Sequence, residues 1–252
     1  MTRQMTHAPA QDALPPLARV CLFLDFDGTL VPLAPTPDAI EVPQAVPDLL
    51  DRLHRATDGR VLIVSGREVA AIAGFLPDFA GDIAGGHGAE IRQGGTLRPH
   101  PLAGTDAAQA LVAAIAAAGE AEGFLVERKK TGAVLHYRET PDRADHARRI
   151  MEDILQDRPA FALHDAKMAW EARPKDADKG GIVARVMADH PPQIVPVMIG
   201  DDVTDEEAMQ AARDRGGFGV KVGKGETVAD LRLPDPAAVA HFLADWIDGG
   251  PR

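Results

Sequence analysis

Short apolar runs alternate with segments of helical spacing along much of this chain, and this alternation limits its fold more than any other feature. Apolar runs stand at 20–24, 61–64 and 195–199, and segments with helical patterning follow at 43–58 and 204–215. Strands and helices that alternate in this way form a parallel sheet with helices on its faces. We therefore predict an α/β fold with a Rossmann-like parallel sheet.

The middle of the chain follows a different pattern. An alanine-rich helix is followed by two strands, at 124–129 and 133–138, around a Thr-Gly turn, and then by a second helix and two more strands. Because two strands joined by a tight turn pair antiparallel, this segment predicts an inserted α+β module with a sheet of its own. The expected divisions are a disordered leader at 1–18, a parallel-sheet domain at 19–94 and 174–252, and the inserted module at 95–173.

Composition argues against several classes of partner. The net charge of -11, from 27 basic and 38 acidic residues, disfavours a large surface that binds nucleic-acid phosphates. The single cysteine, Cys21, lies within an apolar run, so no disulfide framework exists and a reducing compartment is expected. The sequence shows no secretory signal and no apolar run long enough to cross a bilayer. We therefore expect a cytoplasmic protein that acts on a small molecule, without nucleic-acid or membrane partners.

Polar side chains suited to catalysis follow several of the predicted strands. Because the carboxyl ends of parallel strands meet at one edge of a sheet, where ligands bind, we expect these side chains to lie together. They are Asp25 and Asp27 after VCLFL, Ser65, Gly66 and Arg67 after VLIV, Lys179 at the start of a helix, and Asp201 and Asp202 after VPVMIG. Carboxylates gathered at one point need a cation, and hard oxygen ligands suit Mg²⁺, which also binds phosphate. The sequence therefore predicts Mg²⁺ as a cofactor.

These residue types predict phosphoryl transfer. Asp25 can attack phosphorus as a carboxylate nucleophile and form an aspartyl-phosphate. Asp27, two residues further on, can protonate the leaving oxygen and then activate water. Ser65 and Lys179 suit the phosphoryl oxygens, because a hydroxyl donor and a fixed positive charge stabilise the developing charge. Gly28 allows the backbone to approach the substrate closely.

Other phosphate-binding motifs fit the chain less well. GVKVGKGE at 219–226 lacks the spacing of a P-loop, and GGHGAE at 85–90 lacks the third glycine of a dinucleotide fingerprint, because Ile91 stands there. The glycines of GGHGAE are better explained by a hinge or a turn. Signal-receiver domains also combine an acidic pair with a phosphorylated aspartate, but their acidic pair comes first. Here the pair at 201–202 comes late, which argues against a receiver.

Taken in order, DFDGTL, SGR, Lys179 and GDDVTDE resemble the four motifs of the haloacid-dehalogenase-like (HAD) phosphatases. Within that superfamily GGHGAE, the ERK and HYR strands, and WEARPKDADKG at 170–180 are similar to trehalose-6-phosphate phosphatases. The similarity runs from about Arg19 to Val222. It implies a HAD-type core with the inserted module as a mobile cap. It also implies a Mg²⁺-dependent hydrolase that converts trehalose 6-phosphate to trehalose and phosphate in trehalose biosynthesis.

The resemblance also assigns roles to individual residues. It implies Asp201 as a metal ligand with Asp25 and Asp27, and Asp202 and Asp205 as supporting acids. The residues that it places around the substrate are Gly28, Thr29, Gly66, Arg67, His87, Gly88, Glu127, Lys129, Glu171 and Arg173. Carboxylate and ammonium groups suit a sugar, because they offer its hydroxyls acceptors and donors.

The sequence leaves two alternatives open. The same chemistry can act on another sugar phosphate, such as a sucrose or glucosylglycerol phosphate ester. The chain can also be a non-catalytic sugar-phosphate-sensing domain, although both acids of DFD are present. Association with a trehalose-6-phosphate synthase is not decided by any motif.

Overall fold

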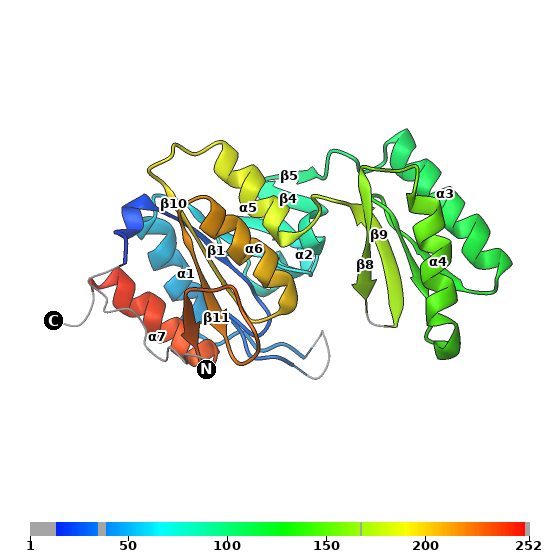
Figure 1. Cartoon of the computed structure of the whole chain (residues 1–252). Helices are drawn as coiled ribbons and strands as arrows, with labels where there is room; N and C mark the ends of the chain where they lie inside the picture. Colours follow the sequence, from blue (N-terminus) through cyan, green and yellow to red (C-terminus); the bar gives the residue numbers. More distant parts are fainter. Residues whose placement is uncertain (1–13, 35–38, 167, 250–252) are drawn as a thin grey trace, which may run out of the picture. The chain divides into compact units, whose positions relative to one another are not determined.

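The computed structural model describes residues 14–34, 39–166 and 168–249, which Figure 1 shows in colour. Most of the leader expected at 1–18 therefore lies outside the described residues. The last part of that segment departs from the expectation, because Leu17 is buried and the indole N–H of Trp246 donates to the carbonyl of Pro15 at 3.0 Å. Among the described helices, none combines the length and the apolar character needed to cross a membrane.

The described residues divide into two compact units. The first lies within Met1–Arg98 and Asp178–Arg252, and the second is Pro99–Ala177, so the second is inserted into the sequence of the first. The dividing points follow Arg98 and Ala177, whereas the sequence suggested divisions after residues 94 and 173.

The first unit is built on an eight-stranded sheet in the order β12-β11-β10-β1-β2-β3-β4-β5. Its strands are β1 (Val20–Leu24), β2 (Val61–Val64), β3 (Asp82–Gly85), β4 (Glu90–Gln93), β5 (Thr96–Pro99), β10 (Val195–Gly200), β11 (Phe218–Val222) and β12 (Leu231–Leu233). Neighbours from β12 to β3 are parallel, and β4 runs antiparallel to β3. The carboxyl ends of β1, β2 and β10 therefore meet at one edge of the sheet.

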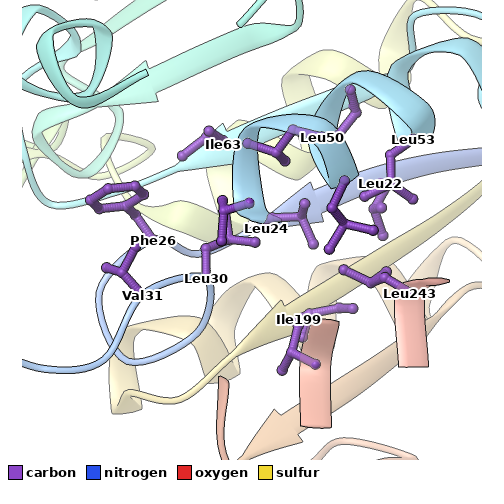
Figure 2. Packing of buried hydrophobic residues seen from close by; sticks show 14 of the residues in the cluster. Leu22, Leu24, Phe26, Leu30, Val31, Leu50, Leu53, Ile63, Ile199 and Leu243 are labelled. Carbon is purple, nitrogen blue, oxygen red and sulfur yellow. The ribbon is translucent and has the colours of Figure 1, made fainter. Parts of the chain in front are cut away.

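Helices pack on both faces of this sheet. They are α1 (Ala45–Ala56), α2 (Val69–Phe75), α5 (Lys179–Ala188), α6 (Val203–Asp214) and α7 (Pro236–Ile247). Side chains of a strand alternate between faces, so Leu22 and Leu24 of β1 join the cluster with α1, α2 and α7, which Figure 2 shows. Cys21 and Phe23 join the other cluster, with α5 and α6. Strand β1 is thus buried on both faces, as its uninterrupted apolar sequence predicts.

Several strands at the edges of this sheet have no clear signal in the sequence. The pattern analysis did not anticipate β3, β4, β5 or β12, which have three or four residues each. Strand β5 is exposed at every position, so no apolar alternation marks it. The turn expected at GGHGAE is confirmed, because a short 3₁₀ helix, η3 (Gly86–Gly88), lies between β3 and β4.

The second unit has a separate antiparallel sheet in the order β6-β7-β9-β8, with two helices packed on one face. Its elements are α3 (Asp106–Ala121), β6 (Leu125–Arg128), β7 (Ala133–His136), α4 (Ala144–Leu155), β8 (Phe161–Ala166) and β9 (Ala169–Pro174). Val126 and Leu135 of the sheet share a buried cluster with Leu111 of α3 and Met151 of α4. The predicted fold class, a parallel-sheet α/β domain with an inserted α+β domain, is confirmed.

Candidate active site

A pocket of about 300 Å³ lies at the carboxyl edge of the sheet in the first unit. The residues that line it are Asp25, Asp27, Leu33, Ser65, Gly66, His87, Lys179, Asp201, Asp202 and Thr204. The structure thus brings together the strand-end side chains that the sequence analysis selected.

Asp25 and Lys179 form the buried centre of this pocket. Asp25 follows β1, and its backbone N–H donates to the carbonyl of Ile199 at 2.9 Å, which keeps it in line with β10. Lys179 is the first residue of α5, and its Nζ donates to Oδ1 of Asp25 and to Oδ1 of Asp205, both at 2.6 Å. Asp178 caps this helix by accepting the Gly181 N–H at 2.6 Å. The lysine is therefore fixed against two carboxylates, with 3% of its surface exposed.

Burial and the neighbouring acids change the proton affinity of these groups. Burial raises the pKa of Asp25 from 3.8 to about 8, with further contributions from Asp205 and Asp201, and Lys179 opposes this rise. Burial and Asp205 also raise the pKa of Asp201. Burial lowers the pKa of Lys179, but Asp25 and Asp205 outweigh it and hold that pKa above its ordinary value. The ionised forms of Asp25 and Asp201 are therefore disfavoured in this pocket, and a bound cation would favour them.

Three carboxylates are arranged to hold a cation. Asp25, Asp201 and Asp205 each offer an oxygen atom, and these atoms lie within 4.8 Å of one another. Hard carboxylate ligands fit Mg²⁺. Asp27 is not in this group; its carboxylate pairs with Arg67, at 2.6 Å from Nε and 2.9 Å from Nη2.

Glycines allow close approaches at two points of the pocket. Gly28 has a φ of +81°, and a Cβ atom there would lie 2.3 Å from Oδ2 of Asp201. A Cβ atom on Gly66 would lie 2.6 Å from Nε2 of His87. Next to Gly28, the buried Thr29 donates from Oγ1 to Oδ1 of Asp201 at 3.3 Å. These positions need glycine because an acidic or aromatic side chain occupies the space that a Cβ would fill.

The loop after β2 carries Ser65 and contacts the turn that carries His87. Oγ of Ser65 accepts the Arg67 N–H at 3.1 Å, and the carbonyl of Ser65 accepts the His87 N–H at 3.1 Å. His87 has a φ of 52°, a left-handed conformation that is uncommon outside glycine, and Gly88 follows with a φ of 98°. This turn directs His87 to the pocket.

The acidic loop after β10 is held by two residues that act on its backbone. Asp202 caps α6 and forms a capping box with Asp205, whose Oδ2 accepts the Asp202 N–H at 2.9 Å. Nζ of Lys221 donates to the carbonyl of Asp201 at 2.6 Å and lies 3.1 Å from Oε1 of Glu206. Sequence reasoning missed Lys221; the available signal is a lysine inside the apolar strand FGVKV, where it is 3% exposed.

The sugar-binding residues expected in the inserted module gather on one face of its sheet. Glu127 pairs in register with Val134, and Val134 with Glu171, so the two acids lie on one side. Nζ of Lys129 donates to Oε1 of Glu171 at 2.7 Å, and Nη1 of Arg173 lies 3.8 Å from Oε2 of the same residue. This polar face, made of Glu127, Lys129, Glu171 and Arg173, lies opposite the face that packs on α3 and α4.

Comparison with known proteins agrees with this geometry. A model of the trehalose-phosphatase family matches residues 23–236. Trehalose-6-phosphate phosphatase of Escherichia coli strain K12 is 33% identical over 246 residues, which cover 96% of this chain and 90% of that protein. A probable trehalose-phosphate phosphatase of Sinorhizobium fredii is 38% identical over 222 residues, and the match covers 83% of that protein.

Solved structures give the same result for the fold. Trehalose-6-phosphate phosphatase of Aspergillus fumigatus superposes with a TM-score of 0.77 at 26% identity, covering 92% of this chain and 94% of that one. A haloacid dehalogenase-like hydrolase from Bacteroides thetaiotaomicron shares the fold alone, with a TM-score of 0.64 at 14% identity over 88% of this chain and 97% of that one. The predicted resemblance to trehalose-6-phosphate phosphatases is therefore confirmed, and the chain belongs to the trehalose-phosphatase family.

Proposed function

We propose that this chain hydrolyses trehalose 6-phosphate to trehalose and phosphate, as a step of trehalose biosynthesis. The observation that carries the proposal is a buried nucleophile, Asp25, held at 2.6 Å by Lys179 in a pocket lined with further acids, in a chain of this family. The identity of the sugar is inferred from the names of the related proteins. The strand-end geometry supports the chemistry.

In the proposed reaction, Asp25 attacks phosphorus through a carboxylate oxygen and forms an aspartyl-phosphate. The bond between phosphorus and the sugar oxygen breaks, and Asp27 gives that oxygen a proton. Asp27 then takes a proton from the water that attacks the phosphoryl group and restores Asp25. Lys179 and Ser65 stabilise the charge on the phosphoryl oxygens.

Asp25 and Asp201 are the proposed ligands of a Mg²⁺ ion, with Asp27 as the third ligand expected from the sequence. Bound Mg²⁺ supplies positive charge that lets the phosphate dianion approach the carboxylate. Asp202 and Asp205 support the loop of Asp201, by the capping box described above. The carboxylate of Asp205 also belongs to the group of three that fits a cation, so it is a further candidate ligand.

We further propose that the first unit is the catalytic core and that the second unit is a cap that binds the sugar and determines which sugar is accepted. Glu127, Lys129 and Glu171 are the proposed contacts to the sugar hydroxyls, and Arg173, His87 and Gly88 are further proposed substrate-binding residues. The ion pair of Lys129 with Glu171 supports this role, because it presents donors and acceptors on one sheet face. A cap that closes over the substrate would exclude water from the transfer step.

A cytoplasmic location and the absence of nucleic-acid and membrane partners stay predictions. Fractionation of cells that express the tagged chain would check the location. Co-purification with a trehalose-6-phosphate synthase would decide whether the two associate.

The test is phosphate release from a panel of phosphorylated sugars, in Mg²⁺ and again with excess chelator. We expect Mg²⁺-dependent turnover of trehalose 6-phosphate above the other sugars, and loss of that turnover in Asp25→Asn with the fold retained. Turnover of another sugar phosphate instead would mean that the polar face of the second unit binds that sugar and not trehalose. Release from no sugar by a folded protein would favour the sensing domain.

A further inference from the structure

Asp27 and Arg67 form a two-point ion pair beside the pocket, between the loops that follow β1 and β2. Nε of Arg67 lies 2.6 Å from Oδ2 of Asp27, and Nη2 lies 2.9 Å from Oδ1. The two side chains are 18% and 29% exposed, so water screens the pair only in part. A planar guanidinium that contacts both carboxylate oxygens fixes the orientation of the carboxylate as well as its distance.

Both partners of this pair are themselves anchored. The guanidinium of Arg67 lies over the ring of Phe75, 5.5 Å from its centroid. The ring of Phe75 stacks at 5.8 Å on that of Phe26, the fully buried neighbour of Asp27 in the chain. The backbone N–H of Arg67 donates to Oγ of Ser65 at 3.1 Å. The Phe75–Phe26 contact and the loop that carries Ser65 thus hold the pair in place.

Lys179 and Arg67 pair with separate carboxylates. Lys179 donates to Asp25 and Asp205, which belong to the group that fits a divalent cation. Arg67 binds Asp27, which does not belong to that group. This division places one cation on the attacking carboxylate and the other on the carboxylate that moves protons.

We propose that Arg67 is a positioning residue, which orients Asp27 toward the leaving sugar oxygen and acts through Asp27 rather than by binding the substrate. The inference rests on the proposed function and replaces the substrate-binding role that the resemblance implied for Arg67. In the first step the phosphorus–oxygen bond breaks, its electron pair stays with the sugar oxygen, and that oxygen takes the proton of Asp27. While Asp27 carries this proton it keeps one contact with Arg67 through its other oxygen, and the two-point pair forms again once the proton has left.

The experiment measures kcat and KM for trehalose 6-phosphate with Mg²⁺ in five variants beside the unmodified chain. They are Arg67→Met, Arg67→Lys, Asp27→Asn, the double variant Arg67→Met with Asp27→Asn, and the control Arg52→Met. The control breaks the Arg52–Asp248 pair, at 2.6 Å, whose residues do not line the pocket. Thermal unfolding verifies that each variant is folded, and Arg67→Lys keeps the test usable if the methionine variant is not.

We expect kcat of Arg67→Met to fall at least about tenfold, and by no more than the roughly 10²- to 10⁴-fold that a positioned proton donor contributes in total. KM should change by less than about threefold. The double variant should be no slower than Asp27→Asn, since residues that act as one unit are not additive. Arg67→Lys should recover part of kcat, because an ammonium cannot make the two-point contact.

Three results would overturn the inference while the proposed function stands: a rise in KM with kcat unchanged, losses that multiply in the double variant, or full recovery with lysine. The first result would make Arg67 a substrate contact. If the unmodified chain releases no phosphate from any sugar phosphate, the proposed function fails, and this inference fails with it.

Discussion

At the scale of single residues, the surroundings of Asp25 disfavour the ionised carboxylate that the proposed reaction requires. The carboxylate is 4% exposed and shares its surroundings with two other acids, so its pKa rises to about 8. The ordinary value of 3.8 applies when the chain is unfolded. Without a cation, folding therefore favours the protonated acid over much of the neutral range, although the Lys179 ammonium opposes this.

A first prediction concerns the metal-free protein. Between about pH 4 and pH 8 the folded chain binds more protons at Asp25 than the unfolded chain, so the free energy of unfolding should fall as pH rises through this interval. The slope from one group is at most about 1.4 kcal/mol per pH unit. Urea denaturation in chelator at pH 5 and pH 8 measures it. Asp25→Asn should show a flatter dependence; an equal slope in both proteins would contradict the assignment.

A second prediction concerns Lys221, which holds the backbone of Asp201. Lys221→Met removes the hydrogen bond to that carbonyl and leaves Glu206 without its ammonium partner, so the loop should hold the cation less well. We expect the Mg²⁺ concentration for half-maximal phosphate release to rise about tenfold or more. Arg215→Met, which removes an exposed positive charge at the end of α6, is the matched control. An unchanged Mg²⁺ requirement in the Lys221 variant would contradict this role.

Single residues also show which features of the site could be predicted from the sequence and which could not. The grouping of Asp25, Ser65 and Asp201 was predictable because parallel strands bring their carboxyl ends together whatever the side chains do. The pairing of Asp27 with Arg67 depends on side-chain rotamers of two separate loops, which no spacing in the sequence specifies. The role of Lys221 depends on β11 lying next to β10, a neighbour relation that is fixed only when the sheet is assembled.

At the scale of elements, clear local chemistry made some helices predictable, and its absence hid several strands. Helix α7 begins with Asp235 as its cap and Pro236 in its first turn, as its sequence predicts. Strands β4 and β5 have the sequences EIRQ and TLRP, in which few apolar residues alternate. They are strands because an existing sheet edge offers hydrogen bonds to them, and a local pattern carries no information about that edge.

A third prediction follows for the start of α7. Oδ1 of Asp235 accepts the Ala238 N–H at 2.9 Å, so Asp235→Ala should lower the free energy of unfolding by about 1 kcal/mol. Asp235→Ser keeps an acceptor at the cap and should lose much less. Urea denaturation midpoints at equal slope give the comparison. Equal losses in the two variants would show that the cap bond is not the cause.

At the scale of the whole molecule, the described residues form two hydrophobic clusters on the large sheet and a third within the inserted unit. The third cluster draws its members from α3, α4 and the small sheet, all within Pro99–Ala177. A unit with its own core and its own sheet has what independent folding requires.

A fourth prediction is that residues 99–177, expressed alone, form a cooperatively folded domain. Circular dichroism during heating should show one sigmoidal transition, and amide NMR signals should be well dispersed. Met151→Ala, which empties part of this core, should abolish or strongly lower that transition, since such changes cost about 2–5 kcal/mol. A fragment without a transition would show that the inserted unit depends on the rest of the chain.

The position of β1 between β2 and β10 has a consequence for synthesis on the ribosome. Strand β1 is made early, but its neighbour β10 (Val195–Gly200) is translated only after the whole inserted unit. The nascent chain therefore carries β1 with one edge unpaired until β10 has been made, and Lys179, Asp201 and Asp205 also come after the insertion. The pocket can close around Asp25 only after Lys179, Asp201 and Asp205 have been translated, so a ribosome that stops before residue 200 releases a chain without an assembled site.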